Sequence, residues 1–213
     1  MPVPIARPLV VVVCALVAFA WAAGASAALE LGARGPAVER LSVRLAGLGY
    51  LPRAAAGPRF TRSVHWAVTA FQKYERIAVD GIVGPETRAA LRDARRPSLG
   101  RGTGRRVAVS LGRQLAFLVA RKGQVVHALS VSTGRPRHRT PSGRFEIFWR
   151  ERSSSADYGR WLPWAAYFLR GYAFHGAATV RNRPSSHGCV RVPRPFARGL
   201  YDFARVGTAV VIR

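Results

Sequence analysis

The sequence predicts a multidomain α and β protein, in which a small three-helix bundle is followed by a β-rich sandwich. Apolar residues recur at helical steps of three and four before residue 92, and in strand-like runs after residue 106. Between them, residues 93–105 are rich in Arg, Pro, Gly and Ser, which favours a linker. With 213 residues, of which 49% are hydrophobic, the chain can bury two small cores. We therefore expect domains over 28–92 and 106–213.

The first 27 residues resemble an export signal. Arg7 precedes an apolar run from Leu9 to Gly24, and Ala25-Ser26-Ala27 follows, a small-x-small pattern that a signal peptidase accepts. The run covers 16 residues, fewer than the ~20 that cross a bilayer as a helix. We expect residues 1–27 to be a signal peptide and the mature chain to lie in the cell wall or periplasm. The alternative is an uncleaved membrane anchor.

The net charge of the chain is +24, carried almost entirely by arginine. Such an excess indicates a polyanionic partner, of which nucleic acid is the first candidate. Export argues against nucleic acid, because the polyanions outside a bacterial membrane are wall polymers and lipid headgroups. Affinity for the wall and a plain compositional bias toward arginine remain as the two explanations.

Cysteine use points to one reactive thiol. Of the two cysteines, Cys14 falls in the predicted signal, so the mature chain retains Cys189 alone and forms no internal disulfide. An unpaired thiol in an oxidising compartment indicates reactivity, and the alternative is a buried, inert side chain.

Three short helices are predicted before residue 92. Gly49 is positioned to end the first, Thr61 to cap the second, and Gly84-Pro85 to begin the third, while Asp80-Gly81 marks a turn between the last two. The apolar faces of the first two helices consist of Val38, Leu41, Leu45 and Leu48, and of Val64, Val68 and Phe71.

Strands dominate after residue 106. One amphipathic helix is expected around Phe196, Leu200 and Phe203, and Lys122-Gly123 marks a turn. The segments with strand character are 107–111, 115–120, 125–132, 143–149 and 208–212.

The residues capable of catalysis concentrate between His175 and Arg191. A thiol reacts as the thiolate, and a nearby imidazole can take its proton. His187 would share a face with Cys189 in an extended segment, whereas His175 must be brought in by the fold, so the residues alone leave the choice of base open. Gly188 permits a tight backbone in which the amides around Cys189 form an oxyanion hole.

A metal site is the main alternative for these residues. His175, His187 and Cys189 are three possible zinc ligands. However, the spacing of the last two is short for a zinc loop, and no acidic residue lies nearby to act as a base. We expect no metal.

Other aromatic and histidine residues have weaker signals. His65, His127 and His138 are expected to be structural or solvated. Four aromatic residues before His175 predict either a lid or sugar-stacking wall, or packing under the site. They are Trp161, Trp164, Tyr167 and Tyr172.

Residues 29–92 resemble the peptidoglycan-binding domain attached to many wall hydrolases. Ser42 departs from the family pattern, which usually has glutamine there. The resemblance implies a module that localises the protein without chemistry, and a helical spacer is the alternative. The matching residues are Leu48-Gly49-Tyr50, Phe60, Ala67-Val68, Phe71-Gln72, the run Asp80 to Thr87, and Leu91.

Residues 106–213 resemble the YkuD-type catalytic domain of L,D-transpeptidases. The resemblance rests on His175-Gly176, on Ser186-His187-Gly188-Cys189 with Arg191 two residues on, and on the upstream blocks 132–134 and 140–145. It implies that Cys189 is the nucleophile and that His175 is the proton acceptor and donor, with its ring oriented by a backbone carbonyl at about Gly176. Ser186, His187, Gly188 and Arg191 would support the site. Arg191 replaces an asparagine of many members, and it either contacts a substrate carboxylate or is solvated.

The reaction implied by this resemblance is acyl transfer on the tetrapeptide stems of peptidoglycan. Cys189 would release D-alanine and form a thioester, which the amine of another stem resolves as a 3–3 cross-link. Water as the acceptor would make the protein an L,D-carboxypeptidase, and members that attach proteins to the wall also exist. The partners implied are stem peptides and glycan, and the family needs no cofactor. A catalytically silent wall-binding protein is the other hypothesis, disfavoured by the presence of both His175 and Cys189.

Overall fold

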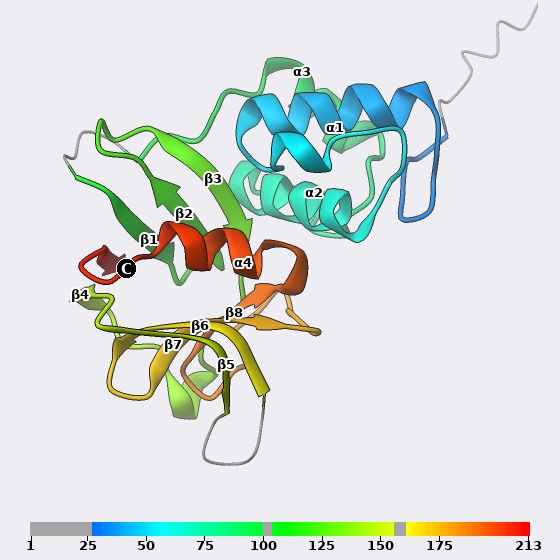
Figure 1. Cartoon of the computed structure of the whole chain (residues 1–213). Helices are drawn as coiled ribbons and strands as arrows, with labels where there is room; N and C mark the ends of the chain where they lie inside the picture. Colours follow the sequence, from blue (N-terminus) through cyan, green and yellow to red (C-terminus); the bar gives the residue numbers. More distant parts are fainter. Residues whose placement is uncertain (1–26, 100–103, 156–160) are drawn as a thin grey trace, which may run out of the picture.

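The computed structural model describes residues 27–99, 104–155 and 161–213 (Figure 1). The predicted signal segment, apart from residue 27, lies outside the described residues. Within these three ranges no helix is both long and apolar enough to cross a membrane.

The structure confirms the predicted fold class. Three α-helices form the N-terminal part, and two sheets with one further helix form the rest (Figure 1). The helices are α1 (Pro36–Leu48), α2 (Arg62–Glu75), α3 (Pro85–Asp93) and α4 (Arg194–Phe203), with short 3-10 turns at Arg53–Ala55 and Pro136–His138.

Local signals in the sequence define the ends of the three N-terminal helices. Gly49 ends α1 in the left-handed conformation, with a φ of 86°, which glycine adopts without steric cost. The Thr61 hydroxyl accepts a hydrogen bond from the Val64 amide at the start of α2, and Pro85 is the first residue of α3. All three predicted boundaries are confirmed.

The turn between α2 and α3 is fastened to the bundle by Gln72, which is fully buried. Its side-chain nitrogen lies 2.7 Å from Asp80 Oδ1 and 3.1 Å from Thr87 Oγ1, and its oxygen accepts the Gly81 amide at 2.8 Å. Gly81 has a φ of 75°, and a Cβ there would lie 2.2 Å from the His65 ring. This glycine and its buried partners explain why the run from residue 80 to 87 has its characteristic sequence.

The C-terminal part consists of two sheets. The five-stranded sheet has the order β3-β2-β1-β9-β4, and the four-stranded sheet has the order β5-β6-β7-β8. Helix α4 packs against both, since Phe196 contacts the His127 ring of β3 and Ala197 lies against Gly176 of β7. The strands are β1 (Arg106–Ser110), β2 (Leu115–Val119), β3 (Val125–Ser130), β4 (Gly143–Glu146), β5 (Trp149–Ser155), β6 (Trp161–Leu169), β7 (Tyr172–Ala177), β8 (Val190–Pro193) and β9 (Ala209–Ile212).

The segment 143–149, predicted as a single strand region, is divided between the two sheets. The chain passes from one to the other at two residues: the Ile147 amide donates to Thr208 O, and the next amide, of Phe148, donates to Tyr167 O. Ile147 is fully buried at this crossing. A period of two in the sequence identifies a strand but not the sheet that receives it.

Helix α2 joins the two parts through a buried lysine. Lys73 is 6% exposed, and its Nζ lies 2.7 Å from Ser130 Oγ and 3.3 Å from the carbonyl oxygens of Gln114 and Val131. Burial lowers the pKa of Lys73 to about 7, because the charged form loses its hydration. The three acceptors satisfy the three N–H bonds of the ammonium group.

In the described part of the predicted linker, Arg96 lies between the two parts. Arg96 donates to Gly47 O at the end of α1 and to Val125 O of β3, at 2.7 and 3.2 Å. The linker sequence has no periodic apolar face that would predict packing. A guanidinium group can nevertheless donate hydrogen bonds to carbonyl groups on both sides of it.

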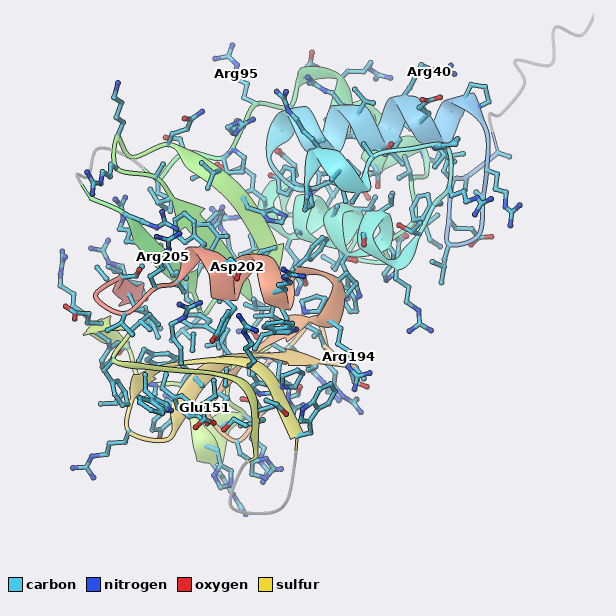
Figure 2. The ribbon with its side chains drawn as sticks, in the orientation of Figure 1. Arg40, Arg95, Glu151, Arg194, Asp202 and Arg205 are labelled. Carbon is cyan, nitrogen blue, oxygen red and sulfur yellow. The ribbon has the colours of Figure 1, made fainter. Side chains whose placement is uncertain are left out.

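Figure 2 labels exposed arginine side chains on both parts of the molecule. Arg40 and Arg95 extend from the helical part, and Arg194 and Arg205 from the part with the sheets (Figure 2). All four are exposed. Both parts therefore carry exposed positive charge.

Candidate active site

His175 lies on β7, and Cys189 immediately precedes β8, the parallel neighbour of β7. In the register of β7 and β8, Phe174 pairs with Val190 and His175 with Arg191. Phe174 and Val190 are fully buried in the core. Because side chains alternate along a strand, His175 and Arg191 lie on the opposite face, and Cys189, one residue before β8, lines the same cavity as they do.

That face borders a cavity of about 840 Å³, a size typical of small-molecule sites. His175, Cys189 and Arg191 lie in its wall, and Tyr172 and Arg194 lie beside them. The fold thus brings together two residues that are 14 positions apart in the sequence.

The His175 ring is held by its own strand. Its Nδ1 lies 2.9 Å from Gly176 O. A carbonyl oxygen can only accept, so Nδ1 carries the hydrogen, and in the neutral ring Nε2 is the nitrogen that can take a proton. Gly176 has no room for a side chain, because a Cβ there would lie 2.9 Å from the Cβ of Ala197 on α4.

The Cys189 side chain is partly buried in the wall of the cavity. Burial raises the pKa of the Cys189 thiol, opposed by a backbone hydrogen bond at Ala173 and by the charge of Arg191. The Sγ–H group points to Gly171 O at 3.5 Å. At neutral pH the thiol is therefore mainly protonated, and a reaction needs a base to remove its proton.

Ser186 shapes the loop before the cysteine. Its hydroxyl donates to Cys189 O and accepts the Gly188 amide at 3.0 Å. The Gly188 amide, expected as one donor of an oxyanion hole, thus has a partner inside the loop. Gly188 has a φ of 122°, and the Tyr172 ring lies 2.5 Å from the position of a Cβ.

The upstream sequence blocks hold the same loop from outside. Thr133 O accepts the amides of Ser185 and Ser186. The Thr140 hydroxyl donates to Gly188 O at 2.6 Å and accepts the Gly134 amide at 2.9 Å. Thr133 and Thr140 belong to the two upstream blocks of the family pattern, but the sequence alone did not predict that they bind this loop.

His187 lies at the rim of the cavity. The positive φ of Gly188 breaks the extended geometry that would place His187 on the face of Cys189. The ring is exposed, its Nε2 accepts from the Arg135 guanidinium at 2.9 Å, and it lies against the His138 ring. His138, to which the sequence assigned no catalytic role, also lines the cavity.

The four aromatic residues before His175 divide between the two expected roles. Trp161, Tyr167 and Tyr172 line the cavity. Trp164 instead packs on Tyr201 of α4, with ring centroids 5.5 Å apart.

Replacing Gly188 by alanine is expected to destabilise the protein by about 1–3 kcal/mol, the range for a residue forced into a rare backbone conformation. The methyl group would also displace Tyr172 from the cavity wall, so the variant should react more slowly. Urea unfolding measures the first effect. Gly199→Ala is the matched control, because a Cβ meets nothing within 4 Å there and alanine favours a helix by about 0.5–1 kcal/mol. Equal stability of the two variants would contradict the expectation.

Among the residues that the structure describes, no three His, Cys, Asp or Glu side chains gather closely enough to hold a metal ion.

Comparison with known proteins places both parts in families. Residues 104–212 match the L,D-transpeptidase catalytic domain (YkuD), and residues 34–91 match the peptidoglycan binding domain. No curated protein matches the chain.

Solved structures agree with this assignment. An L,D-transpeptidase from Xylanimonas cellulosilytica is 32% identical, with a TM-score of 0.80 over 87% of this chain and 97% of that one. An L,D-transpeptidase from Stackebrandtia nassauensis, 24% identical, shares the fold with a TM-score of 0.53 over 87% of this chain and 94% of that one. The chain belongs to the L,D-transpeptidase family, with a YkuD catalytic domain preceded by a peptidoglycan-binding domain.

Proposed function

We propose that the protein forms 3–3 cross-links between tetrapeptide stems of peptidoglycan, with Cys189 as the nucleophile and His175 as the acid and base. The observation that carries the proposal is that both side chains line one cavity, on β7 and directly before its neighbour β8. The fixed tautomer of His175 supports it, because Nδ1 is bonded to Gly176 O and Nε2 is then the basic nitrogen.

In the first half-reaction the Cys189 proton moves to His175 Nε2, and the thiolate attacks the carbonyl that joins the diamino acid to the terminal D-alanine. The tetrahedral intermediate collapses as the carbon–nitrogen bond breaks. His175 returns the proton to the departing amine, which leaves as D-alanine. The stem remains on Cys189 as a thioester.

In the second half-reaction the side-chain amine of another stem attacks the thioester. His175 takes a proton from that amine, the new amide bond forms, and the sulfur leaves as thiolate. Water in place of the amine would release the stem as a free acid, so the same site would then act as an L,D-carboxypeptidase.

Arg191 is proposed to bind a carboxylate of the stem. It lies in the wall of the cavity beside the reacting residues, and a guanidinium binds a carboxylate through two parallel hydrogen bonds. Ser186, His187 and Gly188 support the site by defining the loop that presents Cys189. The exported location, with residues 1–27 removed and the peptidoglycan-binding domain bound to the wall, belongs to the same proposal.

Intact-protein mass spectrometry tests the proposal. Residues 28–213 are mixed with a disaccharide-tetrapeptide, and Cys189→Ala is the control. We expect a transient adduct equal in mass to the stem minus D-alanine, absent from the control, and a cross-linked dimer when a second stem is supplied. A hydrolysed stem without dimer would indicate the carboxypeptidase. No adduct and no D-alanine from folded protein with a titratable thiol would indicate a silent wall-binding protein.

A further inference from the structure

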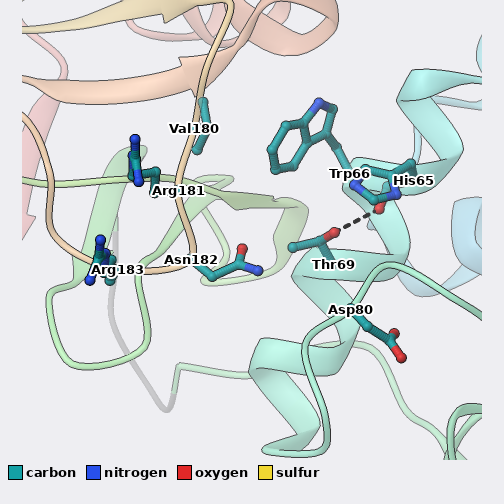
Figure 3. A pocket seen from close by; sticks show the side chains of 8 residues that line it. All are labelled: His65, Trp66, Thr69, Asp80, Val180, Arg181, Asn182 and Arg183. Atoms are coloured by element: carbon teal, nitrogen blue, oxygen red, sulfur yellow. Dashed lines mark hydrogen bonds between the residues drawn. The ribbon is translucent and has the colours of Figure 1, made fainter.

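A second cavity, of about 480 Å³, lies between the two domains. One wall belongs to α2 and the turn after it, with His65, Trp66 and Asp80 (Figure 3). The other wall is segment 180–183, which lies between His175 and Cys189 in the sequence. Neither domain contains this cavity alone, and the reaction proposed above does not use it. We call it the interdomain groove.

Both walls of the interdomain groove are held in place. The Asn182 side chain donates to Val79 O of the helical domain at 3.1 Å. On the other side, the Ser132 hydroxyl donates to Arg183 O at 2.7 Å. Segment 180–183 is therefore fixed to both domains before any ligand arrives, which lowers the entropy lost on binding.

The side chains of the groove combine one aromatic ring with polar groups. The Trp66 ring extends from α2 toward segment 180–183 (Figure 3), and it is partly exposed. The Asp80 carboxylate and the Asn182 amide supply hydrogen-bonding groups along the same groove. A flat apolar face bordered by polar groups matches a pyranose ring, which presents C–H bonds on its face and hydroxyl groups at its edge.

The groove is also positively charged on the side of segment 180–183. Arg181 and Arg183 both line it and are exposed, whereas Asp80 is the single acidic residue among its lining residues. Guanidinium groups only donate hydrogen bonds, so this side of the groove suits the hydroxyl and carbonyl oxygens of a sugar.

The groove and the active-site cavity are continuous along the chain. Ala178, Thr179, Ser186 and His187 line the active-site cavity, and segment 180–183 between them lines the groove. One loop of the chain therefore contributes to both cavities, so a polymer bound in the groove contacts the loop that precedes Cys189.

We propose that the interdomain groove binds a sugar of the glycan strand whose stem peptide reacts at Cys189. The proposal rests on the proposed function for the identity of the polymer. It assigns Trp66 the stacking face, and it assigns Asn182, Asp80 and the two arginines hydrogen bonds to the polar groups at the edge of the sugar. Both domains then bind the donor strand together in the interdomain groove. In this arrangement the helical domain does not bind the wall independently of the catalytic domain.

Binding of stem-free glycan strands tests the proposal without catalysis. Strands from which an amidase has removed the stems are titrated into residues 28–213 carrying Cys189→Ala, and binding is followed by calorimetry. In that background, Trp66→Ala and Asn182→Ala are expected to weaken binding by about tenfold, the change that 1.4 kcal/mol produces. The matched controls are Trp149→Ala and Arg40→Ala, exposed residues far from the groove lining, and they should bind as the parent does.

Each outcome decides the proposal. Retained binding of the strands by both groove variants overturns it. Displacement of the bound strands by free tetrapeptide, with no displacement by free sugar, also overturns it. Trp66 is partly buried and Asn182 fastens the segment to Val79 O, so thermal unfolding accompanies each titration, and exposed Arg181→Gln supplies the decisive variant if the other two do not keep their fold. The absence of a thioester in the mass-spectrometry experiment would leave these titrations unchanged, so failure of the proposed function and failure of the groove are distinguishable.

Discussion

Replacing His175 by glutamine is expected to slow thioester formation by about 10²–10⁴-fold, the usual contribution of a positioned acid and base. Burial raises the pKa of the Cys189 thiol, so little thiolate exists at neutral pH without a base. Glutamine keeps a hydrogen-bonding side chain of similar size but cannot exchange a proton. The rate of adduct formation in single-turnover mass spectrometry measures the loss.

The pH dependence of alkylation separates the role of His175 from a change in fold. In the wild-type chain, iodoacetamide should modify Cys189 increasingly fast as the pH rises, through and beyond the ordinary thiol pKa of about 8.5. The His175→Gln variant should react more slowly at pH 7, and the two chains should converge at high pH, where the thiol ionises without a base. His187→Gln is the matched control and should lose much less. A larger loss in the His187 variant would make His187 the base.

Replacing Lys73 by methionine is expected to change how stability depends on pH. The pKa of Lys73 is about 7 in the folded chain and about 10.4 in an unfolded one. Between these values the unfolded chain binds more protons, so the free energy of unfolding rises with pH, by up to about 1.4 kcal/mol per pH unit. Below pH 7 both states are protonated, and above pH 10.4 both are neutral, so Lys73 adds no slope there.

The comparison of slopes isolates this effect from the titration of other groups. Urea unfolding at several pH values between 7 and 10 should show a smaller rise for Lys73→Met than for the wild type. Lys122 is the other lysine of the chain and is exposed, so Lys122→Met should keep the wild-type slope. Absolute stability at one pH is less informative, because methionine removes a buried charge but also leaves the Ser130 hydroxyl and two carbonyl groups without their donor. Parallel curves for Lys73→Met and the wild type would show that Lys73 stays charged in the fold.

Helix boundaries in the N-terminal domain were predictable because their causes are local. A glycine in the left-handed conformation, a threonine at an N-cap and a proline in the first turn act on residues within a few positions. The structure has all three, at Gly49, Thr61 and Pro85. In contrast, the sequence did not predict β6 as a strand and indicated only a group of aromatic residues before His175. Pro163 and two tryptophans interrupt the alternation of apolar and polar residues that marks a strand.

The candidate site was predictable to a similar degree. The family pattern named His175, Cys189 and the two upstream blocks, and each has a definite place around one cavity. It did not indicate His138 at the rim, the engagement of the Gly188 amide by Ser186, or the packing of Trp164 on Tyr201 while the other three aromatic residues line the cavity. These features depend on contacts between residues far apart in the chain.

By itself, the sequence determined the fold class, the helix ends and the chemical groups of the site, because periodicity, capping and side-chain chemistry are properties of short segments. Tertiary structure alone decided that segment 143–149 serves two sheets, that Lys73 is buried between the domains, and that the pairing of β7 with β8 brings His175 and Cys189 to one cavity. The physical reason is strand pairing and burial. The register of β7 against β8 and the positive φ of Gly188 orient these side chains, and both result from packing across the whole domain.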